Sequence, residues 1–325
     1  MGSWPGTDPR RANRMIRDLL AEEGLPFLAE LPARGPGADL VGRTAAALPD
    51  LAVDLQPSGW RLAGGRGRDS ARGAAYLRQD LDELAEAYDG YTGELKLSMC
   101  GPWTLAAQVA LPRGEKALSD PGACRDIRQA VCAAAVDHLA QVQSLVPGAT
   151  LILQWDEPGL TAVLQGRVPT DSGFSRLRAV DPHTAREAFA EVVATTVGIA
   201  QEVVLHSCAG TPPLALTADV AGLGIAVDSS LLEFGEWEQV AELVESDRAP
   251  WLGMLPSDTT ARHPREYVER VTTQWGRLGL RPAQMAGLTI SPACGLAGNS
   301  EEHAVAVLKL LQAAGQELAE AAQNS

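Results

Sequence analysis

Three residues whose side chains bind soft metals occupy two places in the chain: His206 and Cys208, separated by one residue, and Cys294 in a Pro-Ala-Cys-Gly turn. In extended backbone, residues i and i+2 point to the same side, so an imidazole and a thiolate can face one site. Two thiolates and one imidazole suit Zn²⁺, and three protein ligands with one open position are typical of catalytic zinc. The pattern predicts a zinc site.

A fourth ligand for this site is expected at Asp228, which ends the next apolar run. The alternatives for Asp228 are a cap of the following turn or a partner that orients a ligand. A thiol that enters the open position of such a zinc would lose its proton at neutral pH. The chemistry that follows is alkyl transfer to a thiolate.

Carboxylates form a second group of candidates. Asp156 and Glu157 follow one apolar run, and Glu30 follows an earlier one. They could bind a substrate ammonium group, act as a general base, or cap a helix through their negative charge. Asp156 and Glu157 are the predicted catalytic pair.

These residues share a place in the predicted architecture, because each stands at the end of an apolar run that alternates with a helical stretch. This alternation predicts an α/β fold with a parallel sheet, and the carboxyl ends of its strands would form one rim. Seven strands are expected, at 26–31, 94–99, 150–155, 202–207, 222–227, 250–255 and 285–290. Helices are expected at 9–23, 70–88, 120–146, 182–200, 236–246, 264–276 and 300–322.

The predicted fold class is a single (β/α)8 barrel spanning residues 1–325, with a long insertion at 32–69 after the second strand. The eighth strand would be the first in sequence and would lie immediately before Gly2 and Ser3. Either the start of the chain is trimmed, or the barrel is irregular there.

Composition narrows the class of partner. The 27 basic and 41 acidic residues leave a net charge of −14, which repels nucleic acid and anionic membranes. The five cysteines are predicted to be thiols, and we expect a cytoplasmic protein because the start of the chain lacks a targeting pattern. A small molecule is the expected ligand.

With these pieces in place, the chain resembles the catalytic C-terminal half of cobalamin-independent methionine synthases, which share a superfamily with uroporphyrinogen decarboxylase. The resemblance covers nearly the whole chain. Its motifs, in the family's order, are Gly2-Ser3-Trp4-Pro5, Gly101-Pro102-x-Thr104, Asp156-Glu157-Pro158, His206-x-Cys208 and Cys294-Gly295-Leu296.

The resemblance implies a methyltransferase in which His206, Cys208 and Cys294 bind zinc. Asp228 takes the place of a further carboxylate ligand, where the family usually has Glu. It also implies that homocysteine is the acceptor thiol and that methionine is the product. The residues implied to hold homocysteine are Gly2, Ser3, Glu30 and Asp156.

Two departures affect the side that would bind the methyl donor. The family has a Trp that stacks on the pterin where this chain has Gln108, and an Asp-x-His-Ser where this chain has Leu255-Pro256-Ser257-Asp258. The resemblance therefore implies a short form that takes methyl from a methylated corrinoid, free or protein-bound, in place of methyltetrahydrofolate.

The alternatives are a zinc alkyltransferase for another thiol, a metal-free tetrapyrrole decarboxylase, and a zinc protein without turnover.

Overall fold

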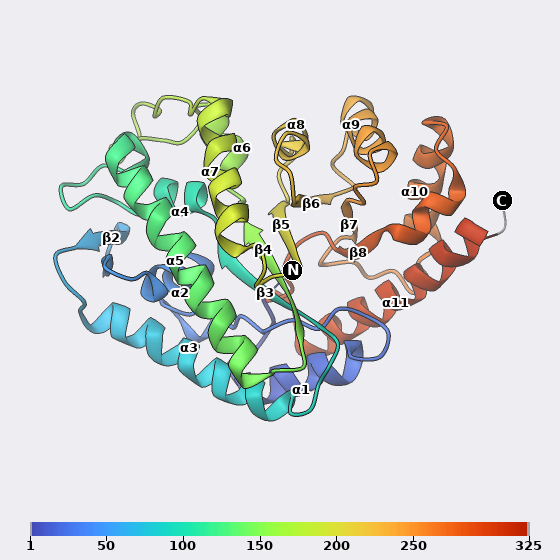
Figure 1. Cartoon of the computed structure of the whole chain (residues 1–325), viewed down its shortest axis with the longest axis horizontal. Helices are drawn as coiled ribbons and strands as arrows, with labels where there is room; N and C mark the ends of the chain where they lie inside the picture. Colours follow the sequence, from blue (N-terminus) through green and yellow to red (C-terminus); the bar gives the residue numbers. More distant parts are fainter. Residues whose placement is uncertain (1, 324–325) are drawn as a thin grey trace.

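A computed structural model describes residues 2–323 of the chain, and residues 1 and 324–325 are not described. At its centre is a curled parallel sheet of six strands in the order β3-β4-β5-β6-β7-β8 (Figure 1). The strands are β3 Glu94–Cys100, β4 Thr150–Asp156, β5 Glu202–Ser207, β6 Leu223–Asp228, β7 Trp251–Leu255 and β8 Thr289–Pro292. The α/β class and the parallel sheet are confirmed.

Helices surround the sheet, and those predicted from sequence are present with small shifts at their ends (Figure 1). They are α1 Pro9–Leu20, α3 Arg68–Ala87, α5 Pro121–Leu145, α7 Pro182–Thr196, α9 Phe234–Glu245, α10 Arg265–Arg277 and α11 Glu301–Gln323. Helices α1, α5 and α7 begin at a proline preceded by an aspartate whose carboxylate accepts backbone N–H bonds. These caps fix where each helix begins.

Shorter helices lie close to the carboxyl ends of strands. They are α4 Pro102–Gln108, α6 Leu160–Leu164 and α8 Leu214–Ala218, and 3₁₀ turns occur at Pro32–Arg34, Ala117–Ser119 and Pro282–Gly287. The last of these turns covers part of the strand predicted at 285–290, so β8 begins later than expected. Pro282 starts this turn, and β pairing begins only after Gly287.

The strand predicted at 26–31 is not formed as a strand. Phe27 makes an isolated parallel bridge to Lys96 of β3, and Glu30 makes one to Ser3. Pro26 has no backbone N–H to donate, so a continuous ladder cannot begin there. On the far side of Ser3, its carbonyl accepts the N–H of Leu296 at 3.0 Å. The short segment around Ser3 thus lies between the two ends of the sheet.

The insertion predicted at 32–69 has its own secondary structure. It contains helix α2 Leu40–Ala47 and an antiparallel hairpin of β1 Ala52–Gln56 and β2 Gly59–Ala63. Helix α2 packs against α3 and brings Arg43 towards the sheet, where its guanidinium forms a buried ion pair with Asp80 of α3. The insertion is therefore part of the wall around the pocket described below.

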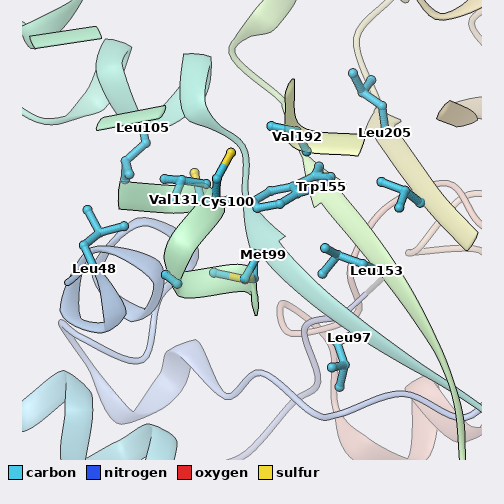
Figure 2. Close-up of a cluster of buried hydrophobic side chains, with 14 of the residues drawn as sticks. Leu48, Leu97, Met99, Cys100, Leu105, Val131, Leu153, Trp155, Val192 and Leu205 are labelled. Carbon is cyan, nitrogen blue, oxygen red and sulfur yellow. The ribbon is translucent and has the colours of Figure 1, made fainter. Parts of the chain in front are cut away.

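The main apolar core lies between the outer face of the sheet and the helices. Leu97 of β3, with Leu153 and Trp155 of β4, projects into it, and Val131 of α5 and Val192 of α7 lie in the same cluster (Figure 2). All five side chains are buried. Because side chains alternate along a strand, the residues between these ones face the inside of the curled sheet. None of the described helices is long and apolar enough to span a membrane.

Candidate active site

A pocket of about 220 Å³ lies at the carboxyl ends of the strands. Its lining joins residues that are far apart in sequence: Gly2, Ser3, Glu30, Pro32, Ala38, Leu40, Asp156, Pro158, His206, Cys208, Cys294 and Gly295. All but two of the residues predicted to be catalytic or to bind metal or substrate are among them. The parallel sheet brings them together, since strand ends share one rim.

Hydrogen bonds fix the orientation of His206. Its Nδ1 lies 2.6 Å from Oδ1 of Asp156, which also accepts a 2.7 Å bond from Nε2 of Gln154. Asp156 and His206 are register partners on β4 and β5, which places their side chains next to each other. Since Asp156 occupies Nδ1, the nitrogen left for a metal is Nε2. Histidine ligands of metals commonly make such a bond to a carboxylate.

The two substrate-facing carboxylates differ in their electrostatic surroundings. Burial acts to raise the pKa of Asp156, but the hydrogen bond and charge of His206 outweigh it and lower the pKa to about 2. Burial raises the pKa of Glu30 to about 7, opposed by the charge of Arg43, whose Nε lies 3.9 Å from Oε1 of Glu30. Asp156 is the more firmly ionised of the two.

Cys208 and Cys294 face each other across the pocket, with their Sγ atoms 4.0 Å apart. The hydrogen bond between them lowers the pKa of Cys294 to about 6 and raises that of Cys208, so one proton serves both thiols. Two sulfurs bound tetrahedrally to one Zn²⁺ at about 2.3 Å lie about 3.8 Å apart. The spacing of the thiols therefore fits two ligands of a single zinc.

The third predicted ligand, His206, lies in the same pocket. In their present positions, no three His, Cys, Asp or Glu side chains among residues 2–323 are close enough together to form a metal site. The two sulfurs already have ligand spacing, and Asp156 fixes the orientation of the imidazole in the lining of the same pocket. In chemical type, the donor set of one nitrogen and two sulfurs fits zinc.

Asp228 and Glu157 are the two predicted residues that do not line the pocket. Oδ1 of Asp228 accepts bonds from the backbone N–H and the hydroxyl of Ser230, at 2.9 and 2.6 Å, which is the turn-capping alternative. Metal ligation by Asp228 stays a prediction, and both bonds to Ser230 use Oδ1.

Glu157 is fully buried and caps helix α4. Its carboxylate accepts the N–H of Trp103 at 2.9 Å, the N–H of Thr104 at 2.7 Å and the Thr104 hydroxyl at 2.6 Å. Burial raises its pKa to about 7, opposed by these hydrogen bonds. The helix that it caps follows β3 and not β4, so its partners come from the neighbouring βα unit.

Sequence reasoning missed a set of buried polar residues beneath the pocket. Lys96 and Ser98 alternate with leucines and a methionine on β3, and Nζ of Lys96 donates to Oγ of Ser98 at 2.9 Å. Burial lowers the pKa of Lys96 to about 8, opposed by the charges of Asp156 and Glu30. A polar residue at every second position of a buried strand was the available signal, and Gln154 of β4 follows the same pattern.

Close backbone contacts bring the first described residues to the pocket. A Cβ at Gly2 would lie 2.8 Å from Oγ of Ser98, and a Cβ at Gly295 would collide with Oγ of Ser3. Glycine at both positions lets the Gly2-Ser3 segment pass between Glu30 and the Cys294 turn. Ser3 thereby reaches the site, as the sequence predicts.

An α/β protein with a pocket of two thiols, an imidazole and two carboxylates at its strand ends is suited to thiol chemistry at a metal. Residues 1–317 match the family described as "Cobalamin-independent synthase, Catalytic domain". The chain belongs to this family, as its motifs predict, and it is an S-methyltransferase of the methionine synthase type.

Among solved structures, a B12-independent methionine synthase from Shewanella sp. W3-18-1 in complex with selenomethionine is similar, with a TM-score of 0.48 and 12% identity. The alignment covers 80% of this chain and 70% of that one. No curated protein matches the chain.

Proposed function

We propose that this protein transfers a methyl group to the sulfur of homocysteine, giving methionine, with a zinc ion bound by His206, Cys208 and Cys294. The observation that carries the proposal is the thiol pair of Cys208 and Cys294. Their Sγ atoms are 4.0 Å apart, and they line the same pocket as His206 and two buried carboxylates. Asp228 is the weakest of the proposed ligands, because its carboxylate already caps the Ser230 turn.

The carboxylates explain why the acceptor would be an amino acid. An ammonium group placed between Glu30 and Asp156 would meet the negative charge of Asp156 and would favour ionisation of Glu30, in a buried site where charge-assisted hydrogen bonds are strong. Oδ1 of Asp156 already accepts two bonds, so Oδ2 is the atom that would hold the ammonium. Ser3 and the backbone of Gly2, which line the pocket beside Glu30, would hold the substrate carboxylate.

The metal, when bound, would hold the substrate sulfur as a thiolate at neutral pH. Asp156 keeps the His206 ring fixed, so that Nε2 points away from the carboxylate. The substrate sulfur forms a bond to the methyl carbon, and the bond between that carbon and the donor breaks, its electron pair leaving with the donor. Asp156 thus both positions a ligand and binds substrate. Glu157, whose carboxylate accepts hydrogen bonds from Trp103 and Thr104 of α4, is proposed to act through the fold.

The prediction of a methylcorrinoid donor, or of a corrinoid protein as partner, is wrong, because the family is cobalamin-independent. The reasoning rested on two missing folate-side residues. Gln108 is exposed at the end of α4, outside the pocket lining, so its identity does not define the donor. The absence of a folate contact at one position is not a sign of a corrinoid contact.

We further propose that the chain is one catalytic domain of the (β/α)8 type. Six positions are the strands β3 to β8, and the other two are the bridged segments around Ser3 and Phe27–Glu30. The hydrogen bond from Leu296 to Ser3 supports closure at the carboxyl end.

The test is a methyl-transfer assay to homocysteine in cobalamin-free conditions with methyltetrahydrofolate as donor, together with zinc analysis of the purified protein. We expect methionine formation that is lost on zinc removal and restored by zinc. Cys208→Ser should lose both metal and activity, whereas Cys124→Ser, on α5 outside the pocket, should keep both. Purified protein without zinc and without methyl transfer would favour the decarboxylase-like alternative, and tight zinc without turnover would favour the binding protein.

A further inference from the structure

Arg43, in helix α2 of the insertion, places a buried guanidinium beside the pocket. Its Nε lies 3.9 Å from Oε1 of Glu30, which lines the pocket, and its Nη1 forms the ion pair with Oδ2 of Asp80 on α3. Nη2 has no hydrogen-bond partner among the described residues. Arg43 thus brings a positive charge to the wall that carries Glu30.

Pairing between helices α2 and α3 does not by itself account for Arg43. Asp80 already has a second cation, because Nη2 of Arg34 lies 2.6 Å from its Oδ1 and 2.8 Å from its Oδ2. Arg34 in turn lies over the ring of Tyr76, 4.7 Å from the ring centroid. Burying an ion costs free energy, and apolar residues often replace a buried ion pair without loss of stability. A second buried guanidinium therefore needs another reason.

Charge balance supplies that reason. Arg34, Arg43 and Asp80 together carry one net positive charge, and all three side chains are buried. An uncompensated buried charge is costly, and a carboxylate within about 4 Å compensates it best. Glu30 is the carboxyl group at that distance, on the pocket side of Arg43. It balances the cluster only when it is ionised.

The charged groups around Glu30 act in opposite directions. Burial raises the pKa of Glu30 to about 7, and the charge of Arg43 is the largest influence that opposes this rise. Among the described groups, Asp156 of β4 raises the pKa further and Lys96 of β3 lowers it. His138 of α5 stays neutral, because burial and the charge of Arg43 lower its pKa to about 3. Arg43 is therefore the main support for an ionised Glu30.

The packing of α2 against α3 fixes the position of Arg43 (Figure 1). A Cβ at Gly73 of α3 would lie 2.6 Å from Cβ of Ala46 in α2, so the two helices approach closely. The carboxylate of Asp39 caps α2 by accepting the N–H of Gly42 at 2.9 Å. Arg43 follows Gly42 directly, so its backbone is held at the capped first turn.

We propose that Arg43 is a positioning residue for substrate binding: it keeps Glu30 as a carboxylate at the pocket wall, where Glu30 binds the ammonium group of an amino-acid thiol. The inference rests on the proposed function for the identity of the acceptor. When the ammonium group binds, any proton on Glu30 is lost to solvent, and this loss weakens binding. Because Arg43 reduces the protonated fraction beforehand, it raises the affinity for an amino-acid thiol near neutral pH. A thiol without an amino group gains nothing from Arg43.

The first experiment measures the ionisation of Glu30 in protein without substrate. The protein is labelled with ¹³C at the glutamate side-chain carboxyl, and Glu30→Gln identifies the NMR signal of Glu30. We expect a titration midpoint near pH 7 in the parent and at least about one pH unit higher in Arg43→Met. Arg34→Met is the matched control, because it removes an equally buried guanidinium that pairs with Asp80. The midpoint in this control should stay close to that of the parent.

The second experiment compares KM values for homocysteine in the methyl-transfer assay. At pH 7, Arg43→Met should raise KM by about 5- to 20-fold and change kcat by less than about threefold. The ratio of variant to parent KM should fall as the pH rises from 7 to 9, because Glu30 then ionises in both proteins. Arg43→Lys keeps the charge and should restore most of the affinity. In Glu30→Gln, adding Arg43→Met should raise KM no further.

An equal titration midpoint of Glu30 in the parent and in Arg43→Met would overturn the proposal. It would also be overturned if Arg34→Met raised KM as much as Arg43→Met, since the effect would then arise from the packing of α2 and α3. Should Arg43→Met fail to fold, Arg43→Gln takes its place, because it can keep a hydrogen bond to Asp80 without the charge. The NMR titration needs no turnover. A protein that fails to methylate homocysteine would therefore refute the proposed function, while the titration still decides the effect of Arg43 on Glu30.

Discussion

Replacing Glu157 distinguishes a structural carboxylate from a catalytic one. Glu157→Ala removes the acceptor of three buried hydrogen bonds at the start of α4, two from backbone N–H groups and one from Thr104. Hydrogen bonds to charged groups contribute about 1.5–3 kcal/mol each, and the cost of burying the carboxylate offsets part of their sum. We expect a net loss of about 3 kcal/mol.

The assay is urea unfolding followed by circular dichroism, with Glu157→Gln as the matched variant. The amide keeps one acceptor oxygen in the same place. The loss of unfolding free energy in Glu157→Gln should therefore be about half of that in Glu157→Ala. A loss of about 3 kcal/mol lowers the melting temperature by about 4 °C in a domain of this length, because the unfolding entropy grows with the number of residues. Below that temperature, methyl transfer by Glu157→Gln should stay within about threefold of the parent, because Glu157 does not line the pocket.

The reasoning would be refuted by unchanged stability in Glu157→Ala. It would equally be refuted if Glu157→Gln, folded and stable, lost methyl transfer by more than about a hundredfold, since that is the size expected for a group acting on the reacting atoms.

Three further predictions concern acid stability, substrate binding and the metal. His138 of α5 is buried, and burial lowers its pKa to about 3 from 6.5, so the unfolded chain takes up a proton that the folded chain refuses. The free energy of unfolding should therefore fall as the pH drops below 6.5 towards 3, by about 3 kcal/mol at pH 4.5. In urea unfolding at several pH values, His138→Leu should make this fall less steep. An equally steep fall in the variant would contradict the prediction. Glu30→Gln should raise the KM for homocysteine by about 10- to 100-fold with a smaller change in kcat. The KM for a thiol without an amino group should be the same in the variant and the parent. Cys294→Ser should bind zinc at least about a hundredfold more weakly in a chelator competition, and a full equivalent retained against the chelator would exclude Cys294 as a ligand.

The sequence was sufficient to predict features that depend on local patterns. Apolar runs located six strands, and stretches of helical period located seven of the helices. The rim position of His206, Cys208 and Cys294 followed from the parallel sheet, since residues at strand ends meet whatever their separation in the chain.

Features that depend on distant partners were not predictable. The segment at 26–31 has the composition of a strand, but whether it forms one depends on its neighbours in space. It forms only isolated bridges, from Phe27 to Lys96 and from Glu30 to Ser3. The position of Glu157 in the sequence is compatible with a cap of the helix that follows it. The partners of its carboxylate, Trp103 and Thr104, lie instead in the preceding βα unit. The donor was inferred from single missing residues, which say what is absent and not what binds.

X-ray absorption at the zinc edge, with and without homocysteine, tests the central claim most directly. The account predicts two sulfur ligands, Cys208 and Cys294, and one nitrogen from His206 in the free enzyme, with a third sulfur at about 2.3 Å after homocysteine is added. Cys124→Ser should leave both spectra unchanged, whereas Cys208→Ser should lose the bound zinc and with it the zinc-edge signal. An unchanged sulfur count on adding homocysteine, in protein with a full equivalent of zinc, would contradict the account.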